Sequence, residues 1–404
     1  MSDPVSAPVS APLREIAGVF LRLGFTAFGG PAAHIALMKE EFVVRRKWLT
    51  EAEFLDLLGA TNLIPGPNST EMAIHLGYRR GGWIGLIVAG LCFLLPAALI
   101  VSGFAWAYVR FGALPTVAGL LQAVKPVVVA VVLQAMAGLV RPALKNVPLT
   151  VLGIAVLGAA LFGLAPPYLL FGAGFLTGLA RWWQGESSPV RRSPGSLLAL
   201  LAGVAGMIGL PVLLTFVSFS SRGAVPLSSG ALFAFFLKVG ATLYGSGYVL
   251  LSFLREEPVL RWRWLTEGQL LDAVAVGQVT PGPVFTTATF IGYVLSGPFG
   301  AFLATLGIFL PSFVFVALSG PLIPRLRQSP VMAAFLDGVN VAALALLATV
   351  VWETARTAFT GPFTVSLAIL SAVLLIRYRV NSAWLLLAAA GFGAVCGWLG
   401  LRVS

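Results

Sequence analysis

The amino-acid sequence predicts an all-α polytopic membrane protein built from two homologous repeats. Of its 404 residues, 58% are hydrophobic and 10% are charged, whereas a soluble domain carries about 25% charged residues. Apolar runs with no charge or one charge recur from end to end, as in membrane-spanning helices. We expect about six helices in each repeat, one linking helix, and one helix in each repeat that is broken at a Pro-Gly-Pro sequence.

The repeat is visible by direct comparison of the two halves. Residues 20–67 and 236–283 align without a gap, and 18 of these 48 pairs are identical. After a one-residue deletion, the correspondence continues as far as Leu121 and Leu336. A duplicated half is the usual construction of secondary transporters, whereas soluble repeat proteins have shorter periods of roughly 20–50 residues.

Each repeat contains a Pro-Gly-Pro sequence within an apolar run, at residues 65–67 and 281–283. Proline removes a backbone donor and clashes with the preceding turn, and it disfavours helical geometry in the residue before it. Each run is therefore predicted to break into two half-helices. Broken backbone survives in lipid only where protein or a water-filled cavity covers it, and paired breaks in two halves point to a transporter's binding site.

Composition also limits the function classes. The net charge of +11 does not indicate nucleic-acid binding, because the basic residues lie in short loops between apolar runs, a distribution that orients membrane proteins. Residues 1–12 have no basic segment before an apolar stretch, so they are interpreted as a short disordered tail and not as a cleaved signal. Cys92 and Cys396 lie in apolar helices without metal-ligand spacing. The sequence predicts no metal and no cofactor.

The elements of the first repeat follow in order from its apolar runs. An apolar helix over about 13–37 precedes the charged segment KEEFVVRRKW, whose aromatic and basic residues suit a membrane–water interface. Thr50 and Glu53 form a predicted capping box that begins the half-helix 51–64, and the next half-helix reaches about Tyr78. Four further apolar spans follow at about 83–108, 116–139, 149–164 and 166–180.

The second repeat shows the same succession. An apolar helix over about 230–254 precedes the charged segment REEPVLRWRW. Thr266 and Gln269 form a predicted capping box that begins the half-helix 267–280, and the next half-helix reaches about Leu295. The later spans are expected at about 298–318, 331–352, 362–376 and 382–400.

These elements divide the chain into four parts. A basic linker and an extra helix at 197–219, which has no repeat partner, separate the halves. The expected parts are the tail at 1–12, the first transporter repeat at 13–180, the linker and extra helix at 181–229, and the second transporter repeat at 230–404.

Loop charge leaves the topology open. If the broken segments cross the membrane, an odd number of crossings separates the repeats, which are then inverted, with the 39–48 loop outside and the 255–264 loop inside. With a cytoplasmic N-terminus, the cytoplasmic loops then contain 15 Lys and Arg residues and the external loops contain 8. If the broken segments are re-entrant hairpins, the number of crossings predicts parallel repeats. With an external N-terminus, the cytoplasmic loops then contain 16 Lys and Arg residues and the external loops contain 7. The two biases are too similar to decide between the alternatives.

Several motifs together resemble the prokaryotic chromate ion transporters in their long, two-domain form. The motifs are FGGP at Phe28–Pro31, the two W-L-T-E segments, the Pro-Gly-Pro pair, KPVVVA at Lys125–Ala130 and FLDGVN at Phe335–Asn340. The resemblance covers nearly the whole chain and implies two six-helix halves of opposite orientation. It also implies export of chromate, with sulfate as an analogous anion, driven by an ion gradient across the bacterial inner membrane.

A tetrahedral dianion needs positive charge and directional donors, and a helix N-terminus supplies both. Polar side chains open the half-helices that follow both breaks, and the aligned amides Asn62 and Gln278 precede the breaks. The competing interpretations are that the prolines only let helices pack and that the amides only cap broken ends. The predicted substrate-binding residues here are Asn62, Pro65, Gly66, Pro67, Asn68, Ser69, Thr70, Gln278, Pro281, Gly282, Pro283, Thr286 and Thr287.

Three cations lie deep within apolar spans and complete the predicted anion site: Arg22, its repeat partner Lys238, and Lys125. Charge inside a membrane is costly and usually faces a cavity with a function. The alternatives are that Arg22 and Lys238 reach the headgroups and that Lys125 forms a structural pair with Asp337.

Four residues are candidates for coupling transport to an ion gradient: Glu71, His75, Asp337 and Asn340. Glu71 and His75 lie four apart on one helix face, and His titrates near neutral pH. The competing interpretation is a polar pair near the interface. His34 is interpreted as a packing residue.

The predicted function is secondary-active transport of an oxyanion by a multi-pass inner-membrane protein. No HExxH, GxSxG, Walker A or CxxC pattern occurs, so an enzyme is not predicted. An anion channel is the nearer alternative, and an intramembrane enzyme is the more distant one. The expected partners are a chromate or sulfate-like oxyanion and the lipid bilayer, without nucleic acid; whether the protein forms a homo-oligomer stays open.

Overall fold

Helices form the fold in every part of the chain that the structure describes. The computed structural model describes residues 12–27, 30–61, 64–112, 114–164, 166–184, 225–243, 249–319, 330–378, 380 and 382–399. Within these ranges, four helices are long and apolar enough to cross a bilayer: Asn68–Phe111, Gly119–Arg141, Val284–Leu318 and Pro330–Arg356. The predicted all-α polytopic class is therefore confirmed. The extra helix 197–219 lies outside the described residues, as does the predicted tail apart from Pro12.

The first apolar run of the first repeat is a hairpin, so the prediction of one helix over 13–37 was wrong. Helix α1 (Leu13–Thr26) ends at Ala27, and α2 (Gly30–Lys39) returns and continues into the π-helix η1 (Glu40–Arg45). Arg46, just after η1, pairs with Glu15 at the start of α1, which shows that the two arms run antiparallel. In the sequence, Phe28 and two glycines follow Ala27, and glycine is a poor helix former.

The second repeat begins with an equivalent hairpin in place of the expected helix over 230–254. Its arms are α9 (Ser229–Thr242), and α10 (Leu250–Leu254) with the π-helix η3 (Arg255–Arg261). Lys238 on α9 hydrogen-bonds to Glu257 on η3 at 2.6 Å, and the ring of Phe235 contacts that of Trp262. The charged segments predicted to lie at an interface are therefore the returning arms of the two hairpins.

The Pro-Gly-Pro sequence of the first repeat is the tip of a second hairpin. Its arms are α3 (Glu51–Thr61) and the first segment of α4 (Asn68–Phe111). Arg79, near the end of that segment, pairs with Glu53 at the start of α3, so both arms have their bases on the same side. The predicted capping box at the start of α3 is confirmed by hydrogen bonds between Thr50 and Glu53. The broken segment is thus re-entrant.

The equivalent segments of the second repeat are α11 (Glu267–Val279), the short 3₁₀ helix η4 (Val284–Thr286) and the first part of α12 (Thr287–Ser319). The capping box of Thr266 and Gln269 is present at the start of α11, as predicted.

Both α4 and α12 contain a sharp reversal that follows the Pro-Gly-Pro hairpin. The backbone leaves helical geometry at residues 81–82 and again at residues 296–297. A Cβ added at Gly77 would overlap the carbonyl of Gly85, although eight residues of straight helix would separate them by about 12 Å. Gly292 and Gly300 approach each other in the same way. The second segment of each helix therefore starts beside the base of its own hairpin.

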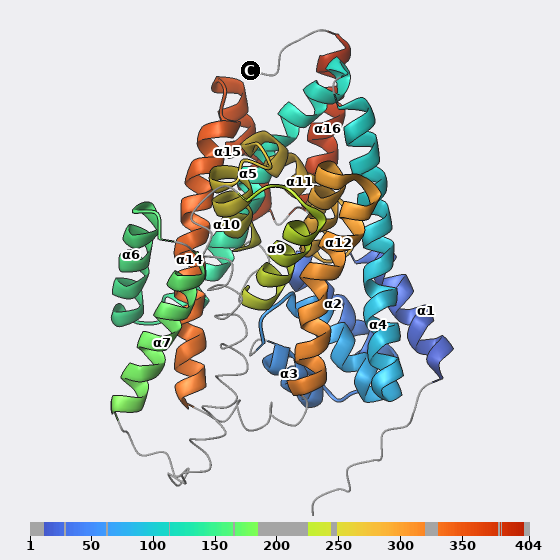
Figure 1. The fold of residues 1–404 in the computed structure, drawn as a ribbon, viewed down its shortest axis with the longest axis vertical. Helices are drawn as coiled ribbons and strands as arrows, with labels where there is room; N and C mark the ends of the chain where they lie inside the picture. The colour runs from blue at the N-terminus through green and yellow to red at the C-terminus, as the bar shows by residue number, and fades with distance from the viewer. Residues whose placement is uncertain are drawn as a thin grey trace, which may run out of the picture.

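The two repeats are inverted. The second segment of α4 starts at Trp83, beside the bases of the first repeat's hairpins, and ends at Phe111. Near that far end, the Tyr108 hydroxyl donates to Asp272 at 3.0 Å, in the first turns of α11. Trp83 and Tyr108 are roughly 37 Å apart along a helix, so the hairpin bases of the two repeats lie on opposite sides. Figure 1 shows α3 near the bottom of the molecule and α11 in its upper half.

Re-entrant hairpins and inverted repeats therefore occur together, and the predicted link between re-entrant segments and parallel repeats was wrong. That prediction counted the first apolar run of each repeat as a crossing. Because this run also folds back, one further crossing is lost from each repeat. For the same reason, residues 39–48 lie on the side of the N-terminal end of α1, and not across the membrane from it.

The later helices join the two repeats into one core (Figure 1). They are α5 (Pro115–Ala143), α6 (Val147–Leu161), α7 (Pro166–Gln184), α14 (Pro330–Ala358), α15 (Pro362–Arg377) and α16 (Ser382–Trp398). Helix α5 packs against α15 and α16 of the second repeat, and α14 packs against α6 and α7 of the first. Leu99, Ile154 and Ile369 are exposed on the outside, as expected for side chains that face lipid.

Candidate functional site

The tips of the four hairpins meet at two crossings inside the molecule. The backbone N–H of Gly66 donates to the carbonyl of Leu243 at 2.8 Å, and that of Gly282 donates to the carbonyl of Ala27 at 2.9 Å. Ala27 and Leu243 are repeat partners, as are the two glycines. Each Pro-Gly-Pro tip thus binds the end of the first helix of the other repeat, which gives the centre a two-fold pseudosymmetry.

Local sequence explains why these groups can pair. Ala27 and Leu243 follow the last residues of α1 and α9, and carbonyls at a helix end lack helical partners. Gly66 and Gly282 have φ values of +135° and +96°, a region that favours glycine. A Cβ at Gly66 would overlap the side chains of Glu71 and Ser312, and one at Gly282 would overlap Ala97. The glycines therefore permit both the turn and the close approach of the other repeat.

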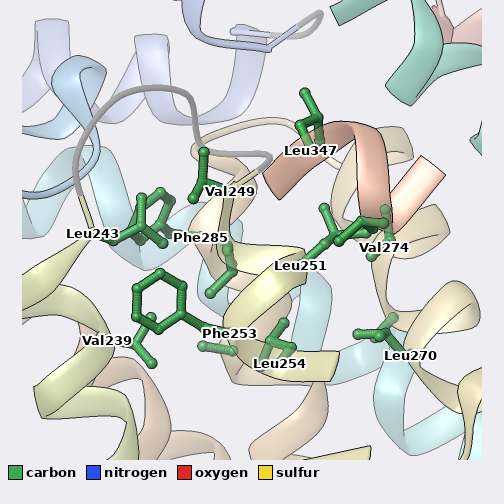
Figure 2. Packing of buried hydrophobic residues seen from close by; sticks show 14 of the residues in the cluster. Val239, Leu243, Val249, Leu251, Phe253, Leu254, Leu270, Val274, Phe285 and Leu347 are labelled. Atoms are coloured by element: carbon green, nitrogen blue, oxygen red, sulfur yellow. The ribbon is translucent and has the colours of Figure 1, made fainter. Parts of the chain in front are cut away.

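Leu243, at the first crossing, belongs to a large cluster of buried apolar side chains. Figure 2 shows Leu243 at the end of α9 and Phe285 on η4, with Leu251 on α10 and Val274 on α11. All four are at most 2% exposed and belong to one hydrophobic cluster. The backbone at the two breaks is buried as well, since residues 64–67 and 281–283 are buried. Protein thus covers the broken backbone, as a bilayer requires.

The crossing at Gly66 carries buried polar atoms that lack partners. Thr70, Glu71 and Ser312 are all 0% exposed. The Ser312 hydroxyl lies beside the Glu71 carboxyl, and no other described group hydrogen-bonds to any of these three side chains. His75, one turn further along α4, is 5% exposed, and its Nε2 is also without a partner there. Buried polar groups are normally satisfied, so the hydroxyls of this cluster fit a place where a polar ligand binds.

The crossing at Gly282 is different. Thr286 and Thr287 donate their hydroxyls to the carbonyls of Pro283 and Val284, at 2.8 and 2.7 Å. His34 approaches the carbonyl of Ala27 through Nε2 at 3.0 Å, beside the bond from Gly282. The two crossings therefore share a backbone arrangement but differ in the polar atoms that they leave open.

The remaining predicted residues at the breaks are placed as follows. Ser69 and Gln278 are buried, at 2% and 4% exposure, and Asn68 is half-buried at the start of α4. Asn62 lies outside the described residues. Among the residues that the structure describes, no three or more His, Cys, Asp or Glu side chains form a group that could hold a metal ion.

Lys125 has a different partner from the one considered in the sequence. Its Nζ lies 3.6 Å from Oδ1 of Asp272, in a cluster that includes Tyr108. The alternative of a structural pair with Asp337 was wrong, because Asp337 pairs with Lys145 at 2.6 Å. Asn340 is exposed. The structure therefore does not bring Asp337 and Asn340 together with Lys125.

Arg22 and Lys238 each pair with a glutamate on the other arm of their own hairpin. Arg22 binds Glu41 with its side chain 51% exposed. Lys238 binds Glu257 with its side chain 2% exposed, and its Nζ lies 5.8 Å from the ring centre of Trp262. An ion pair within each hairpin was not among the interpretations considered for these residues in the sequence.

Sequence reasoning missed Asp272, Tyr108 and Ser312 as members of buried polar clusters. Asp272 carried a usable signal, because its repeat partner is Asp56. Tyr108 and Ser312 lie in apolar spans, and no local pattern marks them. His34 does pack, against the ring of Phe93, but it also reaches the second crossing.

Comparison with known proteins agrees with this architecture. The profile of the chromate transporter family matches residues 14–179 and 230–394, one region in each half. The chain belongs to the chromate transporter family. The match to two regions fits the two inverted repeats of the structure, and this member of the family is a multi-pass membrane transporter.

Individual relatives span nearly the same length. A chromate transport protein of Cupriavidus metallidurans is 31% identical over 94% of this chain and 91% of its own. A chromate transport protein of Pseudomonas aeruginosa is 31% identical over 98% of this chain and 94% of its own. An uncharacterized transporter of Methanocaldococcus jannaschii is 27% identical over 82% and 81%. No solved structure matches the chain.

Proposed function

We propose that this protein is a secondary-active transporter that exports chromate, with sulfate as an analogous substrate. The observation that carries the proposal is the reciprocal pair of crossings, Gly66 with Leu243 and Gly282 with Ala27. Broken helices that meet between inverted repeats are the usual binding site of secondary transporters. Two equivalent but opposite arrangements also supply what alternating access needs, because each repeat can take the role of the other.

The anion is proposed to bind at the crossing that Gly66 forms. Pro67 precedes the N-terminus of α4, whose first N–H groups and partial positive charge favour an anion. The hydroxyls of Thr70 and Ser312 are buried there, and the described residues offer them no partner other than the Glu71 carboxyl beside Ser312. They come from different repeats, so a bound oxyanion would bridge the two halves. Such a ligand responds directly to any movement of one repeat against the other.

Lys125 is proposed to bind the anion at the end of its path that lies beside the base of α11. Its side chain is 23% exposed, and its 3.6 Å separation from Asp272 is longer than a hydrogen bond. The ammonium therefore retains donors for an oxyanion, while Asp272 keeps it from being an uncompensated intramembrane charge. Lys125 also lies beside Gly268 in the first turn of α11, a position that fits one end of a translocation path.

The proposed direction is outward. A membrane potential that is negative inside favours the exit of anions, by about 2.3 kcal/mol per elementary charge at 100 mV. A doubly charged oxyanion would thus gain about 4.6 kcal/mol on leaving the cytoplasm. Export driven by the ion gradient of a bacterial inner membrane needs no nucleotide and no cofactor.

Everted membrane vesicles from cells that express the protein test this function. We expect energised vesicles to accumulate chromate, sulfate to compete, and an uncoupler to stop the accumulation. Vesicles from cells with the empty vector give the background. Absence of chromate accumulation, with folded protein shown in the membrane, would contradict the proposal. A chromate current that is independent of any ion gradient would instead support an anion channel.

A further inference from the structure

We infer that Glu71 is the proton-binding residue of this transporter, and that it must be neutral when the oxyanion binds. The inference rests on the proposed function and names its coupling ion. The sequence allowed Glu71 to be part of a polar pair near the membrane interface. The structure instead buries it completely, in the first turn of α4 beside the Pro-Gly-Pro tip.

The position of the carboxyl group is fixed by its contact with the crossing. A Cβ at Gly66 would overlap both Oε1 of Glu71 and Oγ of Ser312. Glu71 and Ser312 therefore lie against the same α-carbon, one from each repeat. The neighbouring N–H of Gly66 is the group that joins the first repeat to Leu243 of the second. A change of charge on Glu71 thus occurs at the contact between the two halves.

No cationic side chain of the described residues pairs with Glu71. No ion pair of the described residues includes Glu71, and the Ser312 hydroxyl is the one described polar group that lies beside its carboxyl. An isolated ionised carboxylate is so costly to bury that such a group takes up a proton instead. Within a membrane, an acidic side chain of this kind is a functional residue by default.

None of the described charged residues on the elements packed against this part of α4 pairs with Glu71. Neither α12 nor η4 contains an Asp, Glu, Lys, Arg or His residue. The charged residues of α1 and α2 that have described pairs are Glu15 with Arg46, Arg22 with Glu41, and Lys39 with Glu51. Arg14 is exposed at the start of α1, and His34 of α2 is at the carbonyl of Ala27.

The described acidic residues of the other two neighbouring helices, α3 and α11, also pair with Lys or Arg. On α3, Glu51 and Glu53 pair with Lys39 and Arg79, and the side chain of Asp56 is outside the described set. On α11, Glu267 pairs with Arg255, and Asp272 with Lys125. On α4 itself, His75 is the nearest titratable residue, four positions along the same face. It is the natural route for a proton to reach or leave Glu71.

This placement couples the proton to the anion. A dianion at the N-terminus of α4 lies within one helical turn of Glu71, so an ionised carboxylate would repel it. The anion and the proton therefore favour each other's binding, and this linkage is reciprocal. One proton carried with a dianion leaves a net charge of −1, so the inside-negative potential, and not the inward proton gradient, would drive this export.

Proteoliposomes that contain the full-length protein and radiolabelled sulfate separate binding from coupling. Exchange of external for internal sulfate reports the anion site alone. Net accumulation driven by an acidic exterior, with the membrane potential clamped at zero, reports proton coupling. We expect the exchange rate of Glu71→Gln to stay within about twofold of the wild-type rate. Its pH-driven accumulation should be lower than that of the wild type by about tenfold or more.

The control is Glu40→Gln, since Glu40 is half exposed and pairs with Arg45 away from the crossing; it should change neither rate. Wild-type pH-driven accumulation in Glu71→Gln would overturn the inference, as would loss of exchange in a folded Glu71→Gln protein. If Glu71→Gln does not fold, Glu71→Asp must shift the pH midpoint of exchange, and an unchanged midpoint would overturn the inference. Absence of exchange in the wild type would contradict the proposed function itself.

Discussion

Gly66 donates its backbone N–H to the carbonyl of Leu243 at 2.8 Å, and this bond joins the tip of one repeat to the first helix of the other. The equivalent bond from Gly282 to Ala27 repeats the relationship in the opposite orientation. No single repeat contains a complete crossing. The candidate site therefore exists only when both halves are folded against each other.

The first prediction is that Gly66→Ala and Gly282→Ala each abolish transport. Both glycines have positive φ values, where another residue costs about 1–3 kcal/mol, and a Cβ would also overlap the opposite repeat. We expect less folded protein and a loss of chromate accumulation of about tenfold or more, as a change of about 1.4 kcal/mol gives. Gly103→Ala is the control, because a Cβ there meets nothing within 4 Å. Normal transport by Gly66→Ala would show that the crossing is dispensable.

The second prediction is that Lys125→Met lowers chromate transport by about tenfold or more, the equivalent of about 1.4 kcal/mol. It removes the ammonium proposed to attract the anion and leaves Asp272 without its cation. A stranded buried charge destabilises by about 3–5 kcal/mol, so Lys125→Met with Asp272→Asn should recover folded protein but not transport. Detergent-solubilised protein followed by size exclusion measures folding, and vesicle uptake measures transport. Recovery of transport in the double variant would show that the pair is only structural.

A matched control for this pair is Lys145→Met. Lys145 pairs with Asp337 at 2.6 Å, but its side chain is 51% exposed. An exposed pair contributes about 0–1 kcal/mol, so neither the amount of folded protein nor transport should change measurably.

The third prediction compares Lys238 with its repeat partner Arg22. Lys238→Met should destabilise strongly, by about 3–5 kcal/mol, since it leaves Glu257 without its buried partner. Arg22→Met should cost about 1 kcal/mol or less, because Glu41 keeps its bond to Arg46 at 2.7 Å. Thermal unfolding of the purified variants measures the difference. Equal destabilisation by the two substitutions would contradict the unequal burial of these pairs.

The fourth prediction concerns orientation. The bases of the first repeat's hairpins carry more basic residues than those of the second: Lys39, Arg45, Arg46, Lys47, Arg79 and Arg80 against Arg255, Arg261 and Arg263. Because cytoplasmic loops carry the excess of Lys and Arg, we expect the first set inside the cell.

Single cysteines at Lys47 and Arg263, in a background without Cys92 and Cys396, test this orientation. These exposed repeat partners should react with a membrane-impermeant maleimide from opposite sides, Lys47→Cys from the cytoplasm. Arg14→Cys should label from the same side as Lys47→Cys, because the first hairpin returns to its starting side. Labelling of Arg14→Cys and Lys47→Cys from opposite sides would mean that the first apolar run crosses the membrane.

The sequence by itself determined the class, the repeats and most helix positions. Apolar runs between charged loops need no tertiary information, because the bilayer requires every spanning backbone to satisfy its own hydrogen bonds. The breaks at Pro65 and Pro281 were equally predictable, since proline acts on its own turn. The capping boxes at Thr50 and Thr266 are local in the same sense and were confirmed.

Only the tertiary structure decided which way the broken segments run and what they meet. The return of α2 along α1 depends on pairs such as Arg46 with Glu15, whose partners are far apart in sequence. Lys125 meets Asp272 and not Asp337, because helix α5 crosses the hairpin of the other repeat. The bond from Gly66 to Leu243 joins groups on different repeats. A sequence pattern reports local preference, whereas these contacts follow from how two inverted halves pack.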